Sequence, residues 1–157
     1  MKTNDLRSLQ ALRQLREQRA SSQLAAQQQR CHETSDALED AKEKLRLHRE
    51  AVAREAENIY GLFSAGLSIT AWHAAQVQLD EWADGQQQLE GSVDQVAETL
   101  DMQERERELF RVARMARQRQ SEACQSLLEV RVQDELRAGE HREEADEIPR
   151  ALPAGAP

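Results

Sequence analysis

An apolar residue recurs at every seventh position through the first part of the chain. These positions are Leu24, Cys31, Leu38, Leu45, Val52 and Ile59. A second set with the same spacing is more polar: Ala20, Gln27, Thr34, Ala41, His48, Glu55 and Leu62. A seven-residue repeat that keeps its register over several heptads is typical of a coiled-coil helix. It predicts a helix over about 4–62, with Thr3 or Asn4 as its N-cap.

The repeat stops in a segment rich in glycine and serine. Residues 61–68 hold Gly61, Ser64, Gly66 and Ser68, which together predict a turn at about 63–69. The apolar pattern then resumes at alternating spacings of three and four. Its positions are Trp72, Ala75, Leu79, Trp82, Gln86, Leu89, Val93, Val96 and Leu100. It predicts a second helix over about 70–146, with Ser68 or Thr70 as its N-cap.

Beyond Leu100 the same frame turns polar, and apolar residues follow a shifted frame. They are Met102, Leu109, Ala113, Ala116, Ala123, Leu127 and Val130. No proline or glycine intervenes, so we interpret the shift as a drift of the seam within one helix.

Two long helices joined by one turn predict an all-α fold, a long antiparallel coiled-coil hairpin over residues 1–147. The second helix overshoots the first, and residues 148–157 are expected to form a disordered tail. Folding about residue 66 places opposite each other residues whose numbers sum to about 132. Cys31 and Cys124 then lie about 35 Å apart, too far for a disulfide.

Composition narrows the class of protein further. The 157 residues include only two Trp, one Tyr and two Phe, and the net charge is −8. So acidic a chain is a poor general binder of nucleic acid. No apolar run is long enough to cross a membrane, and the first residues lack the apolar region of a secretory signal. We therefore expect a cytoplasmic chain that binds no nucleic acid and does not insert into the membrane.

The sequence lacks the motifs that usually carry catalysis. There is no phosphate-binding glycine loop, no HExxH and no pair of histidines four residues apart. Cys31, His32 and Glu33 are adjacent and so point in different directions on a helix. We expect no metal, no cofactor and no enzymatic activity in this chain.

Charge and aromatic residues are distributed unevenly. Residues 67–104 hold eight acids and no Lys or Arg, whereas residues 105–119 hold six arginines. The hairpin brings those arginines to the same end as the basic residues of 1–30. They form either a face for an acidic partner or an ordinary solvated surface. Tyr60, Phe63, Trp72 and Trp82 cluster near the turn, where they either dock a partner or pack against one another.

Four features converge on one family: a basic, leucine-rich start (Leu6–Arg13), tryptophans after the turn (Thr70–Trp72 and Leu79–Trp82), an arginine-rich stretch, and an acidic end (Leu127–Leu136). In this arrangement the chain resembles the central stalk proteins of bacterial type III secretion, the YscO/FliJ-like family. The resemblance implies a monomeric, non-enzymatic stalk. It would link the hexameric secretion ATPase to the export gate at the inner membrane and also handle export chaperones.

Carried onto this sequence, the resemblance implies two partner-binding sets. The ATPase-facing residues are Arg7, Arg13, Arg16, Arg19, Arg111, Arg114, Arg117 and Arg119. The residues that face the export gate are Trp72, Gln76, Leu79 and Trp82. Two other interpretations fit the same pattern: a coiled-coil adaptor or homodimer unrelated to secretion, and a regulator or chaperone that binds client helices through its tip.

Overall fold

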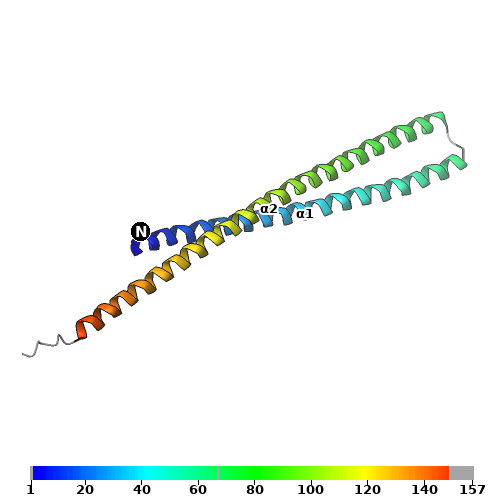
Figure 1. Cartoon of the computed structure of the whole chain (residues 1–157). Coiled ribbons are helices and arrows are strands. Elements are labelled where there is room, and N and C mark those ends of the chain that lie inside the picture. Colours follow the sequence, from blue (N-terminus) through cyan, green and yellow to red (C-terminus); the bar gives the residue numbers. More distant parts are fainter. Residues whose placement is uncertain (1, 67, 149–157) are drawn as a thin grey trace, which may run out of the picture. The chain divides into compact units, whose positions relative to one another are not determined.

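The computed structural model describes residues 2–66 and 68–148, which form two α-helices and no strand (Figure 1). Helix α1 runs over Thr3–Ser64 and helix α2 over Ile69–Glu147. The two helices run antiparallel and pack against each other, which confirms the predicted all-α hairpin. Of the predicted tail, only Ile148 is described. Residues 149–157 lie outside the described part of the chain.

Helix α1 begins at Thr3, one residue earlier than the start predicted from the sequence. Thr3 is already helical, so Lys2 occupies the cap position, and the prediction of Thr3 or Asn4 was wrong. The backbone N–H of Lys2 donates to Oδ2 of Asp5 at 3.2 Å. An acidic side chain three residues into a helix reaches back to the cap in the same way as in a capping box.

Between the helices, glycine and serine act as the sequence predicted. The N–H of Gly66 donates to the carbonyl of Phe63 at 3.2 Å, and Gly66 has a φ of 88°. This left-handed conformation ends α1 without the steric cost that a side chain would bring. The hydroxyl of Ser68 accepts a bond from the N–H of Ala71 at 3.2 Å, so Ser68 is the N-cap of α2.

The chain forms two compact units, each an antiparallel pair of helical segments. Unit 1 combines Met1–Leu24 with Phe110–Pro157, and unit 2 is Ala25–Leu109. Side-chain bonds between α1 and α2 join residues whose numbers sum to between 130 and 139, close to the predicted 132. In unit 1 these pairs are Thr3–Glu135, Arg13–Gln120 and Ser21–Arg114, and in unit 2 they are Gln27–Gln103, His48–Trp82 and Arg49–Glu90.

In unit 2 the seam follows the predicted apolar positions. Cys31 and Leu45 are buried on α1, and most of their predicted partners on α2 are half-buried: Trp82, Leu89, Val93, Val96 and Leu100. Near the turn, Ala56 and Phe63 take the seam positions predicted for Glu55 and Leu62, which are exposed. The shift by one residue keeps a carboxylate out of the apolar seam.

The seam of unit 1 is mixed. Among the residues that the structure describes, it buries the polar Gln10 and Ser121 together with Ala20, Leu24 and Cys124. The free thiols of Cys31 and Cys124 are therefore small fillers, each in the seam of its own unit, as predicted.

The predicted drift of the α2 seam was wrong. Met102, Leu109, Leu127 and Val130 are between 57% and 70% exposed. The original seven-residue frame instead continues through half-buried Arg114, buried Ser121 and half-buried Leu128. The helix has no reason to change register where nothing is inserted into the repeat, so its seam becomes polar and the apolar residues stay outside.

Candidate functional site

All eight arginines of the predicted ATPase-facing set lie in unit 1, four on each helix. Arg13 and Arg114 are half-buried, and the other six are exposed: Arg7, Arg16, Arg19, Arg111, Arg117 and Arg119. Residues 1–24 and 110–123 together carry nine Lys or Arg against three Asp or Glu. The structure therefore brings the two basic stretches together, as the hairpin predicted.

Three of these arginines line one open groove between α1 and α2. Arg16, Arg19 and Arg117 surround it with Ala20, Gln23 and Ala113, and its volume is about 430 Å³. Guanidinium groups bind carboxylates through paired hydrogen bonds, so a groove with three of them can hold an acidic side chain. We refer to it below as the arginine groove.

A glutamine positions the arginines beside the groove. Oε1 of Gln120 accepts a bond from Arg13 at 2.8 Å and another from Arg117 at 3.3 Å. Because the acceptor is a neutral amide, both guanidinium groups keep their charge uncompensated by it. Arg114 has a different role, since its Nε donates to the hydroxyl of Ser21 at 3.0 Å across the seam. It helps to join the two helices and is less available to a partner.

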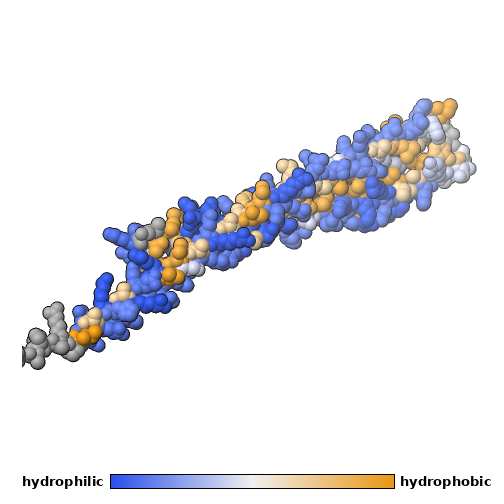
Figure 2. Space-filling view, in the orientation of Figure 1, coloured by the Kyte–Doolittle hydropathy of each residue, from blue (hydrophilic) through white to orange (hydrophobic). Residues whose placement is uncertain are grey.

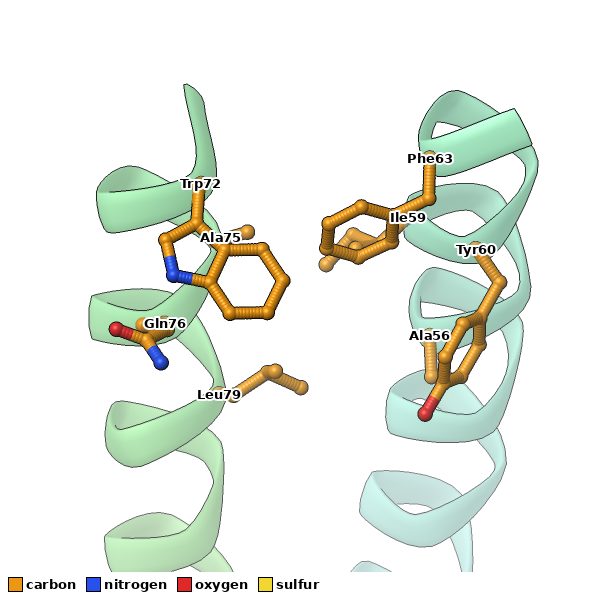
Figure 3. A pocket seen from close by; sticks show the side chains of 8 residues that line it. All are labelled: Ala56, Ile59, Tyr60, Phe63, Trp72, Ala75, Gln76 and Leu79. Atoms are coloured by element: carbon orange, nitrogen blue, oxygen red, sulfur yellow. The ribbon is translucent and has the colours of Figure 1, made fainter. Parts of the chain in front are cut away.

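In unit 2, three of the four predicted gate-facing residues line a second cavity, beside the turn. Trp72, Gln76 and Leu79 of α2 line a space of about 360 Å³ between the helices, and Trp72 and Leu79 point toward α1 (Figure 3). The opposite wall and floor are formed by residues that the predicted set left out: Ala56, Ile59, Tyr60, Phe63 and Ala75. The clustering of aromatic residues in the sequence already pointed to Tyr60 and Phe63.

The aromatic rings of this tip pocket, the eight residues just named, form a continuous series. The centroids of Phe63 and Trp72 are 5.1 Å apart with an edge-on geometry, and those of Tyr60 and Phe63 are 6.2 Å apart. Even so, Tyr60 is 71% exposed and Trp72 is 45% exposed. The rings pack against one another to close the end of the hairpin and still present apolar surface, which is also visible near the turn in Figure 2. The packing interpretation is therefore confirmed for Tyr60, Phe63 and Trp72, and docking of a partner stays a prediction.

Trp82 does not belong to the tip pocket. Its side chain is half-buried in the seam, and its carbonyl oxygen lies 3.1 Å from Nε2 of His48. His48 also lies close to Gly85, where a methyl group would come within 3.2 Å of its ring. The glycine thus makes room for the histidine. His48 is a polar seam residue, as predicted, and Trp82 belongs with it, ten residues along α2 from Trp72.

The perturbed carboxyl groups lie on the surface of unit 2. Hydrogen bonds from Gln86 and then from Arg49 lower the pKa of Glu90 below its ordinary value. A hydrogen bond from Arg46 likewise lowers the pKa of Glu43. Both groups belong to exposed ion pairs, which explain the shifts without a catalytic role.

Within residues 2–66 and 68–148, no three His, Cys, Asp or Glu side chains are grouped so that they could hold a metal ion. In the same residues, neither helix combines the length and the apolar character needed to cross a membrane.

The comparisons with known proteins leave the family open. A scan against protein-family models gives no match, and searches of curated proteins and of solved structures give none either. Function therefore has to be inferred from the arginine groove, the tip pocket and the surfaces around them.

Proposed function

We propose that this chain is a non-enzymatic stalk of a bacterial type III secretion system. Unit 1 contacts the hexameric secretion ATPase, and the tip of unit 2 contacts the export gate at the inner membrane. The chain itself is cytoplasmic and peripheral to that apparatus. One observation carries the proposal: eight predicted arginines gather in unit 1, while the exposed aromatic pocket lies in unit 2 beside the turn. Basic groups in one unit and exposed aromatic groups in the other fit two partners of different chemistry.

The contact with the ATPase is electrostatic. Arg16, Arg19 and Arg117 are exposed in one groove, where they can pair with carboxylates on the inner surface of a ring. Complementary charge accelerates association and sets specificity more than it adds affinity. Such a contact suits a stalk that must engage and leave successive subunits.

The contact with the gate is apolar. Partly exposed aromatic rings around a preformed pocket are the kind of surface in which a few residues dominate binding. Trp72 and Leu79 offer that surface on α2, and Tyr60 offers it on α1. The same pocket can receive an apolar segment of an export chaperone, so chaperone recycling belongs to the proposal.

The mechanism is mechanical. A two-helix hairpin inside a ring of six subunits cannot contact all of them equally. It therefore biases which subunits close on ATP and couples their turnover to the unfolding or export of substrates. This coupling requires no catalytic residue in the chain.

The decisive experiment measures capture of a purified hexameric ATPase of a type III secretion system. The test variant is the triple reversal Arg16→Glu, Arg19→Glu and Arg117→Glu. The matched control reverses Arg30, Lys44 and Arg54, exposed cations of unit 2, so both variants change the net charge equally. We expect the test variant to capture the ATPase about tenfold less well and the control to match the native chain. Higher salt should weaken native capture, because exposed charges are screened.

Equal loss of ATPase capture in both variants would mean that net charge alone controls capture. That result would contradict a specific contact with the arginine groove. Light scattering supplies an independent check, since a stalk is monomeric. A stable dimer at micromolar concentration would instead support a coiled-coil homodimer or adaptor unrelated to secretion.

A further inference from the structure

The tip pocket lies in the most acidic stretch of unit 2. Residues 55–104 contain no Lys or Arg. Their ten acids are Glu55, Glu57, Asp80, Glu81, Asp84, Glu90, Asp94, Glu98, Asp101 and Glu104. All eight residues that line the pocket belong to the same stretch. A partner that enters the pocket therefore meets a negative electrostatic potential.

Three of these acids lie close to the pocket, and we call them the acidic rim. Residues four apart on a helix are rotated by only about 40° and displaced by about 6 Å along its axis. Gln76 lines the pocket, and the exposed Asp80 and Asp84 follow it at this spacing, in a row along α2. On α1, exposed Glu57 lies one turn before Tyr60. The acidic rim comprises Glu57, Asp80 and Asp84.

The cations of the chain leave this rim negative. Arg54 is the last cation before the acidic stretch, and it lies about 160° round α1 from Ala56, away from the pocket. Arg49 pairs with Glu90 at 3.0 Å, farther from the turn. His73, near the rim on α2, carries no formal charge at pH 7. Among residues 2–66 and 68–148, no Lys, Arg or His forms an ion pair with the acidic rim.

The pocket beside this rim suits a bulky apolar side chain. Trp72 and Leu79 point toward α1 across the cavity, yet they are 45% and 41% exposed (Figure 3). An apolar group that fills the cavity would remove this surface from water, which is favourable. The rim then favours a cation about one helical turn from that group, since the step from Gln76 to Asp80 equals one turn of a partner helix.

The acidic rim also makes other occupants unfavourable. The surface of an anionic membrane attracts basic segments and repels acidic ones. Two tips of this chain packed on each other would bring one acidic rim against the other, and like charges in contact oppose association.

We propose that the tip pocket binds a helical segment of another protein that combines one bulky apolar residue with Lys or Arg one turn away. The apolar residue enters the pocket, and the cation pairs with Asp80. A second cation one turn farther along reaches Asp84. That this segment belongs to the export gate rests on the function proposed above.

The test uses the full chain and a short labelled helical peptide. The peptide has one phenylalanine, lysine one and two turns after it, and alanine or glutamine elsewhere. One matched peptide has glutamate in place of each lysine, and another has alanine in place of phenylalanine. Fluorescence anisotropy should show at least tenfold tighter binding of the lysine peptide than of either matched peptide. Salt should narrow its advantage over the glutamate peptide. Equal affinity for the lysine and glutamate peptides, or binding of none, would overturn the proposal.

Charge reversals locate the rim. Asp80→Lys with Asp84→Lys should weaken binding of the lysine peptide at least tenfold and strengthen binding of the glutamate peptide. The matched control is Asp94→Lys with Glu98→Lys. Its two exposed acids lie fourteen residues farther along α2, at the same heptad positions, so the change in net charge and the helix face are the same. The control should change binding less than twofold. Equal losses in both variants would contradict the proposal.

A second pair of variants locates the pocket. Leu79→Ala should weaken binding of the lysine peptide at least fivefold. Val77→Ala, which changes an exposed residue outside the pocket lining, should leave it unchanged. Circular dichroism checks that each variant remains helical. A dimer of the native chain that Leu79→Ala dissociates would instead identify a second copy as the occupant. Binding to vesicles of phosphatidylcholine and phosphatidylserine that Leu79→Ala abolishes would identify a membrane. Either result would overturn the proposal.

Failure of this inference is distinguishable from failure of the stalk proposal. The same variants are used to measure capture of a purified cytoplasmic domain of an export gate protein. If capture depends on Leu79 but not on Asp80 and Asp84, only the preference for a basic segment is wrong. If the peptide preference holds and the native chain does not capture the gate domain, only the stalk proposal is wrong.

Discussion

Units 1 and 2 enclose different residues between the same two helices. In unit 2 the seam holds apolar residues such as Leu45 and Val93, although Leu47 and Val77 are exposed, and most of the acidic residues stay on the surface. In unit 1 the interior holds Gln10 and Ser121, while Leu127 is 62% exposed. Both units leave large apolar residues exposed, so the contrast lies in which residues their seams bury.

This contrast suggests different roles for the two units, stability for unit 2 and partner recognition for unit 1. Burial of apolar side chains is the main favourable term in folding, so unit 2 supplies more of the stability of the hairpin. Hydrogen bonds such as that between Arg114 and Ser21 also join the helices of unit 1, and each contributes only about 1 kcal/mol. Its apolar residues are free to meet a partner. Regions that bind partners are often drawn from the less stable part of a fold.

The largest expected effect comes from truncating the same residue type in the two units. Leu45 is 8% exposed in the seam of unit 2. Leu45→Ala should lower the free energy of unfolding by about 2–3 kcal/mol, because it removes buried methyl groups and leaves a cavity. Leu127→Ala should change it by less than about 0.5 kcal/mol, since Leu127 already meets solvent. Urea unfolding followed by circular dichroism measures both.

These two variants test directly whether Leu45 is buried and Leu127 is exposed in solution. Similar losses from Leu45→Ala and Leu127→Ala would mean that Leu127 is packed against other residues in solution. The slope of the urea transition should stay the same in both, since neither change alters the surface exposed on unfolding.

A smaller effect is expected at the most buried glutamine. Gln27 is 1% exposed, and its Nε2 donates to the backbone carbonyl of Gln103 at 2.9 Å. The side-chain oxygens of Gln27 and Gln103 have no protein partner. Gln27→Leu removes one such buried acceptor and adds apolar contact, so the midpoint of urea unfolding should rise by an amount equivalent to about 1 kcal/mol.

The same substitution should loosen the pairing of the helices. A buried polar residue in a coiled coil fixes register and oligomeric state at a cost in stability. Light scattering of Gln27→Leu should show higher oligomers that the native chain does not form. A variant that is less stable than the native chain and still monomeric would mean that the bond to Gln103 outweighs the unpaired oxygen.

Much of unit 2 could be predicted from the sequence. The repeat from Leu24 to Ile59 fixed the first helix, and the glycine and serine residues near Gly66 fixed the turn. The turn signal depends on local backbone conformation, and the helix signal depends on a long, unbroken seven-residue repeat. The same register also placed the basic stretches together, because a hairpin leaves no other pairing.

The seam of unit 1 could not be predicted in the same way. Beyond Leu100, α2 has two stripes at similar spacing, one polar and one apolar. Periodicity alone does not say which of them faces α1. Hydrophobicity favoured the stripe of Leu109 and Leu127, whereas the structure continues the register set in unit 2 and places Ser121 inside. Likewise, Trp82 shares a helix face with Trp72 but lies ten residues from it, beyond the reach of the tip pocket.

The smallest expected effect is on how the stability of unit 2 depends on pH. Gln86 and Arg49 hold the pKa of Glu90 below its ordinary value of 4.5. The ion pair with Arg49 joins α1 to α2 in unit 2, at 3.0 Å. A carboxyl group whose pKa is lowered in the folded state stabilises the fold above its unfolded pKa, and this stabilisation is lost as the pH falls through the folded value.

Between pH 6 and pH 3 the urea midpoint of the native chain should therefore fall slightly more than that of Glu90→Gln, which has no proton to gain. The exposure of the ion pair keeps the difference small. Gln120→Ala in unit 1 supplies the control, because it removes a neutral acceptor of Arg13 and should leave the dependence on pH unchanged. If Gln120→Ala altered that dependence as much as Glu90→Gln, the pH effect would not be specific to the ion pair of Arg49 and Glu90, which would contradict the prediction.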